Sequence, residues 1–227
     1  MDLRLKNPFI GASVTKKYVA VLLVLLGLMI FHPLLPGTVS NAVLLGAIIV
    51  SAWLVRDQSP HSMGTILVLA IPAVILIMLD AFRPTYFELS ARGPLGLAMT
   101  FLSFALLVFC GVFILKALIA SSEVSGAEIL GTINFFIILG FIWAFAFHTV
   151  HFFRPDSFNV ESAGRHLESE LLYFSFVTLT TLGYGDIVPR NHVVQMLAVI
   201  EAIVGQFYVA VVVAYLVSRY INTRSTD

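Results

Sequence analysis

A nine-residue stretch from Thr178 to Asp186 reads TLTTLGYGD and places glycines at alternate positions, Gly183 and Gly185. Most residues are restricted to negative φ angles by their side chains, whereas glycine also adopts positive φ readily. Alternate glycines therefore allow successive backbone carbonyls to point the same way. A row of such oxygens can replace the water around a cation such as potassium, whose uncompensated charge in a low-dielectric medium costs on the order of tens of kcal/mol.

The carbonyl groups of this stretch are the candidate ligands. The predicted ion-binding residues are Thr181, Leu182, Gly183, Tyr184 and Gly185, with K⁺ held at the first four. The Thr181 hydroxyl would add an oxygen at the inner end, and Tyr184 would point away and brace the strand by packing. Asp186 would concentrate cations at the outer mouth. One chain supplies one side of such a site, so a closed ring predicts a homotetramer with cyclic symmetry.

The composition places these residues in a membrane protein. Hydrophobic residues make up 59% of the 227 residues and charged residues 11%, which leaves too little polar surface for a water-soluble globule of this size. The formal net charge is zero and the longest basic run is Lys16-Lys17, so nucleic acid is not an expected partner. His148, His151 and Asp156 lack a nucleophile and a third convincing ligand, so we expect no enzyme activity, no cofactor and no small-molecule substrate.

The predicted fold is an all-α membrane protein with six transmembrane helices. Spanning the hydrocarbon takes roughly 20 apolar residues. Six segments meet that requirement: 18–35, 39–55, 63–80, 95–119, 129–152 and 192–220. Lysine and arginine favour the cytoplasmic side by eight to five if the chain starts inside, with the bias strongest before the first helix. We therefore expect a multi-pass protein of the cell membrane, in contact with lipids and with both termini cytoplasmic.

The segment between the fifth and sixth spans is different. The run LESELLYFSFVTLTT, residues 167–181, has an apolar helical pattern but is too short to cross. We interpret it as a re-entrant helix that enters from outside, with Glu168 and Glu170 complementing the positive end of its dipole. Non-helical backbone that follows at membrane depth survives only when it is buried in protein or lines a water-filled path.

These residues resemble the signature of potassium channels, whose carbonyl-lined filter is a known example of ion selectivity. The resemblance covers residues 129–220: an outer helix, the re-entrant helix, TLTTLGYGD, IVP and an inner helix containing Gly205. Leu182 stands where the family more commonly has valine or isoleucine. The segments YFSFVTLTTLGYGDIVP and EAIVGQFYVAVVVAYLV are most similar to those of the small bacterial six-transmembrane members. The resemblance implies a potassium-selective, tetrameric pore.

On this interpretation the chain has two parts, a four-helix scaffold at 1–120 and a pore domain at 121–227. The fourth span carries a single basic residue, Lys116, rather than an arginine series, so voltage dependence should be weak or absent. Because few residues follow Tyr220, we expect no cytosolic ligand-binding domain after the last span. The alternatives are a non-selective cation channel, which Tyr184 argues against, and a potassium transporter subunit, which would carry several filter-like loops.

Residues of the last span are further candidates. Gln206, Val209 and Val213 share one helical face and, by the resemblance, would line the cavity below the filter. Gly205 corresponds to the family's hinge glycine, although close helix packing explains a small residue equally well. Glu201 lies about 140° around the helix from Gln206 and should face the back of the re-entrant helix, as a structural support or a gating group.

Three histidines are further candidates for a functional role. His148 and His151 have the spacing of a metal pair, with neutral interfacial side chains as the favoured interpretation. His192 could sense external pH at the start of the last helix.

Overall fold

The computed structural model describes residues 8–31, 126–160 and 167–224, together with isolated helical positions between 101 and 115. Within these ranges the elements are helices: α1 (Pro8–Phe31), α5 (Gly126–Phe153), the short 3₁₀ helix η3 (Pro155–Ser157), α6 (Leu167–Leu179) and α7 (His192–Arg224). One isolated antiparallel β-bridge joins Phe158 to Pro189. The predicted spans at 39–55, 63–80 and 95–119, and with them Lys116, lie outside the described residues apart from those isolated positions.

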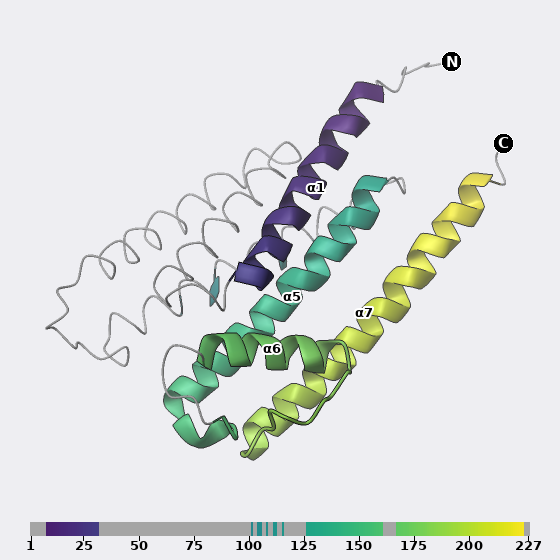
Figure 1. Cartoon of the computed structure of the whole chain (residues 1–227). Coiled ribbons are helices and arrows are strands. Elements are labelled where there is room, and N and C mark those ends of the chain that lie inside the picture. Colours follow the sequence, from purple (N-terminus) through teal and green to yellow (C-terminus); the bar gives the residue numbers. More distant parts are fainter. Residues whose placement is uncertain are drawn as a thin grey trace, which may run out of the picture.

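Figure 1 shows α1, α5 and α7 side by side, with α6 lying across α5 and α7 near one end of the bundle. The start of α1 and the end of α7 lie at the opposite end from α6. The chain after α6 returns along α7 as an irregular segment before α7 begins. The short helix α6 therefore packs against two long helices, and the irregular segment that follows it runs along α7.

Within the described ranges, two helices are long and apolar enough to cross a membrane, through Ile129–Phe153 and His192–Val212. They agree with the predicted spans at 129–152 and 192–220. The helix around the first predicted span differs more, because α1 begins at Pro8 rather than at Tyr18. Lys16 and Lys17 continue it, since lysine is a good helix former and a helix need not stop where its apolar part does.

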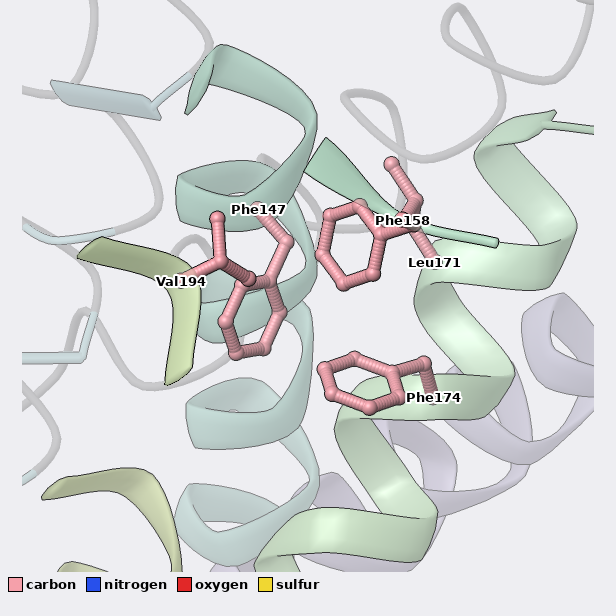
Figure 2. Packing of buried hydrophobic residues seen from close by; sticks show 5 residues of the cluster. All are labelled: Phe147, Phe158, Leu171, Phe174 and Val194. Carbon is pink, nitrogen blue, oxygen red and sulfur yellow. The ribbon is translucent and has the colours of Figure 1, made fainter. Parts of the chain in front are cut away.

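Aromatic side chains tie the elements together at the end of the bundle that holds α6. Phe147 of α5, Phe158 of the connection after η3, Leu171 and Phe174 of α6 and Val194 of α7 form one buried cluster (Figure 2). The three phenylalanine rings meet edge to face, with centroids 5.0 to 5.8 Å apart. Such pairs contribute about 0.5–1.5 kcal/mol each beyond burial, so this cluster fixes α6 against both long helices.

Glycines allow the closest approaches between helices. A Cβ atom at Gly140 of α5 would lie 2.6 Å from the ring of Phe176 on α6. A Cβ atom at Gly205 of α7 would overlap the carbonyl oxygen of Leu179, the last residue of α6. The second contact is with backbone, which cannot move aside as a side chain can. Close packing therefore requires glycine at 205, whatever hinge role this residue has.

The Gly205 contact leads to a stability prediction. Gly205→Ala should destabilise the fold by about 1–3 kcal/mol, because the added methyl group must displace the end of α6. Gly27→Ala is the matched control, since a Cβ there has no neighbour within 4 Å. That variant should be neutral or more stable by about 0.5–1 kcal/mol. Unfolding of both proteins in detergent micelles measures the difference, and equal stabilities would contradict the packing argument.

Candidate functional site

The irregular segment begins where α6 ends, and the helix end holds it. The amides of Leu182 and Gly183 both donate to the carbonyl of Val177, at 2.9 and 3.3 Å. The amide of Thr181 donates to Thr178 over 2.9 Å. The last carbonyls of a helix lack intrahelical partners. Here the next residues of the chain satisfy the carbonyls of Val177 and Thr178, which fixes the direction in which the chain leaves α6.

The backbone then alternates in handedness. Thr181, Gly183 and Gly185 have φ angles of +57°, +59° and +79°, whereas Leu182 and Tyr184 between them have negative φ. Alternation of this kind gathers successive N–H groups on one side of the chain and carbonyl groups on the other. The two glycines adopt positive φ without steric cost. Thr181 does not, because positive φ in a β-branched residue is strained by about 1–3 kcal/mol.

The whole segment lies on the surface of a single chain. Residues 180–186 are all exposed, with Leu182 at 56% and Tyr184 at 67%. The Tyr184 ring also stacks on Tyr173 of α6, with centroids 6.5 Å apart and planes 5° apart. The predicted packing of Tyr184 against the short helix is therefore present, while much of the ring remains uncovered by its own chain.

Asp186, at the far end of the segment, is tied to α6 and to the η3 connection. The Tyr173 hydroxyl donates to the Asp186 carboxylate over 2.7 Å, and the Asn159 side-chain amide donates to the Asp186 carbonyl over 3.1 Å. Asn159 also accepts from the Val188 amide at 2.7 Å. Neither Tyr173 nor Asn159 was among the predicted site residues. Both are ordinary polar residues in sequence, and only folding brings them beside Asp186.

Hydrogen bonding sets the ionisation of this pair. The bond from Tyr173 is the main factor that holds the pKa of Asp186 below its ordinary value. The same bond, with smaller effects of burial and negative charge, raises the pKa of Tyr173 to about 12. A depressed carboxyl pKa means that the interaction is present at neutral pH and is lost as the pH falls through that pKa. At the alkaline end it persists until the tyrosine loses its proton.

The chain between Asp186 and the start of α7 is held by a second set of hydrogen bonds. The amide of Arg190 donates to the Ser157 carbonyl at 2.8 Å, and the Asn191 side chain donates to the Ser157 hydroxyl at 2.7 Å. Asn191 also caps α7, accepting from the Val194 amide at 2.9 Å. The irregular segment is thus attached at both ends by groups outside itself.

At the other end, α7 contacts the first residues of the segment. The Gln206 side-chain amide donates to the Thr181 hydroxyl over 2.9 Å. Gln206 and Val209 are exposed on the single chain, as a predicted pore-lining face requires. Val213 belongs to α7, but its side chain lies outside the described residues.

Glu201 lies behind α6 and not on the exposed face. The side chain is completely buried, and its carboxyl group is 2.6 Å from the Ser175 hydroxyl on α6. This agrees with the predicted orientation toward the re-entrant helix.

The three histidines lie apart from the irregular segment. His148 and His151 belong to α5, and the ring of His151 packs near Phe158 with centroids 6.2 Å apart. His192 begins α7, with its Nδ1 atom 3.2 Å from the Gln195 side-chain oxygen. Within the described ranges, no group of three or more His, Cys, Asp or Glu side chains could hold a metal ion.

The Tyr173 contact can be tested by titration. Tyr173→Phe removes the hydroxyl donor, so the pKa of Asp186 should rise toward its ordinary value. Tyr208→Phe is the control, since that hydroxyl bonds the Thr132 carbonyl and not Asp186. Carboxyl-carbon NMR of aspartate-labelled protein in micelles measures the shift. An Asp186 pKa that is the same in both variants and the unmodified protein would contradict the assignment.

The part of the chain that contains this segment is similar to known ion channels. Residues 108–222, or 115 of the 227 residues, match a family model described as an ion channel. The chain is 30% identical over 73 residues to "Two-pore potassium channel 2" of Arabidopsis thaliana, a match covering 32% of this chain and 16% of that protein. It is 34% identical over 96 residues to "Two pore potassium channel a" of Oryza sativa subsp. japonica, covering 40% and 25% respectively.

These matches span a quarter or less of the relatives' own length, and no solved structure matches significantly. The family model nevertheless covers α5, the whole irregular segment and nearly all of α7. The chain belongs to the ion channel family and is a membrane channel protein rather than an enzyme.

Proposed function

We propose that this channel conducts potassium selectively and passively, with the carbonyls of Thr181, Leu182, Gly183 and Tyr184 as ion ligands. The observation that carries the proposal is the alternation of positive and negative φ from Thr181 to Gly185. This conformation lines carbonyl oxygens along one side of the chain, where they substitute for a cation's water. The distant relatives named as potassium channels support the choice of ion.

The pore requires more than one copy of the chain. Residues 180–186 are exposed on a single chain and follow a helix too short to span a membrane. Unpaired peptide groups at membrane depth are tolerated only when they are buried in protein or line a water-filled path. Copies of the same segment around a shared axis meet both conditions. We therefore propose a homotetramer in which Gln206, Val209 and Val213 line the cavity next to the filter.

The wider architecture belongs to the proposal as well. Six spans, cytoplasmic termini and a division into scaffold (1–120) and pore (121–227) rest on the sequence pattern. The fourth predicted span carries Lys116 as its one basic residue, which favours weak voltage dependence. A non-selective channel is disfavoured by Tyr184, whose ring stacks against α6 and supports a full carbonyl row.

Ion selectivity is tested with purified full-length protein in planar bilayers under opposed potassium and sodium gradients. A reversal potential near the potassium equilibrium value is expected. A reversal potential near zero would contradict selectivity while leaving the channel assignment intact. Cross-linking in the same preparation should give a tetramer, and a monomeric conducting species would contradict the shared pore.

A substitution at Gly183 tests the backbone conformation itself. Because a Cβ there meets no atom within 4 Å of its own chain, Gly183→Ala probes the +59° φ angle rather than crowding within the chain. The strain is about 1–2 kcal/mol in each copy, so we expect loss of potassium flux into liposomes. Gly27→Ala, which changes a glycine in α1, should keep the wild-type flux. Wild-type flux in the Gly183 variant would exclude this backbone conformation as the conducting one.

A further inference from the structure

A buried polar junction joins helices α5, α6 and α7. It consists of the Gly140 carbonyl on α5, the Ser175 hydroxyl on α6 and the Glu201 carboxyl on α7. Ser175 and Glu201 are both 0% exposed. Glu201 lies nine residues into α7, about 14 Å along the axis at 1.5 Å per residue, which is near the centre of a hydrocarbon layer about 30 Å thick.

The number of donor hydrogens available at this junction indicates the protonation state of Glu201. The Ser175 oxygen lies 2.8 Å from the Gly140 carbonyl oxygen and 2.6 Å from the Glu201 Oε1 atom. A serine hydroxyl donates one proton, and a carbonyl accepts only. An ionised carboxylate also accepts only, so one of the two short contacts would then join two acceptors. A protonated Glu201 resolves this, because it donates to Ser175 and Ser175 donates to Gly140.

The surroundings of the carboxyl group favour the same state. Its second oxygen, Oε2, is buried and has no hydrogen-bond partner among the described residues. A buried carboxylate without compensating partners is far more costly than a neutral acid. The titratable side chains on the described parts of the three helices make no hydrogen bond or ion pair with it: His148, His151, Glu168, Glu170, Tyr173, His192, Tyr208 and Tyr215.

We propose that Glu201 carries its proton in the folded channel and serves as a positioning residue, passing a hydrogen-bond chain from α7 through Ser175 to the Gly140 carbonyl. With this proton in place, Glu201 donates to Ser175 and Ser175 donates to the Gly140 carbonyl, so all three groups are hydrogen-bonded. The acid therefore joins helices without placing a charge beside the permeation path.

Two further contacts continue this attachment along α7. Gly205 packs on the last carbonyl of α6, and Gln206 donates to Thr181, the first strained residue of the irregular segment. The three contacts follow one another toward the filter, at Ser175, Leu179 and Thr181. These contacts attach α7 to α6 and to the first residues of the irregular segment, and the link through Glu201 is fully buried.

Infrared spectroscopy of the full-length channel in liposomes at neutral pH tests the proton directly. The difference spectrum between wild type and Glu201→Gln should contain the carbonyl stretch of a protonated carboxylic acid. In Ser175→Ala this band should move to another frequency, because the acid loses its acceptor. A carboxylate stretch at Glu201 in place of the acid band would overturn the proposal, as would a band unaffected by the loss of the Ser175 hydroxyl.

A second experiment measures potassium flux in Glu201 variants, and it rests on the proposed function. Glu201→Gln keeps a neutral donor of the same shape, so it should retain wild-type flux, whereas Glu201→Ala should lose it. A loss of flux in both variants would show that a neutral donor of the same shape is not sufficient and would overturn the proposal. If wild type itself carries no potassium flux, the proposed function fails, and the infrared band still decides the protonation of Glu201.

Discussion

The constraint on which the structure depends is the placement of irregular backbone between the helices of a membrane protein. Residues 180–186 form neither helix nor sheet, and three of them have positive φ. Lipid provides no hydrogen bonds to such peptide groups, so protein or water must do so. The chain meets part of this need internally: amides of the segment donate to the end of α6, and the Asn159 side chain bonds its far end. The rest is left exposed on a single chain.

Rigid packing makes that arrangement possible. Edge-to-face phenylalanines around Phe147 hold α6 between the two long helices, and glycines at 140 and 205 allow the approach to be close. Side chains in a membrane gain little from burial alone, because lipid tails are as apolar as they are. Shape complementarity and hydrogen bonds therefore carry more of the specificity here than in a water-soluble core. The aromatic cluster supplies the first and the Ser175 junction the second.

Polar groups within the bundle follow one rule. Among the described residues, Asn134, Ser157, Ser175 and Glu201 are fully buried, and each has a bonding partner on another element. A polar group in this environment stabilises one arrangement because the alternative arrangements leave it unpaired. Such residues specify how the helices meet and do not merely add stability.

Much of this could be predicted from sequence, because the relevant physics is local. Alternate glycines indicate a backbone that needs positive φ, and apolar length separates a spanning helix from a short one. The spans at α5 and α7 and the short helix α6 followed from these patterns, as did the orientation of Glu201 from its angle on the helix. Helical periodicity depends only on residues of the same helix, so the sequence was sufficient to predict these features.

The contacts between elements were decided only by the tertiary structure. Nothing in the sequence pairs Tyr173 and Asn159 with Asp186, or Gly140 with Ser175, because their partners lie on other elements. The early start of α1 was likewise missed, since hydropathy marks the lipid boundary and not the end of helical hydrogen bonding. Residue types and spacing determined which stretch of backbone could adopt positive φ at alternate positions. The packing of α5, α6 and α7 decided which groups hold this stretch in place. Hydrogen bonds between helices depend on the distance and direction between donor and acceptor, and these are set only when the helices pack together.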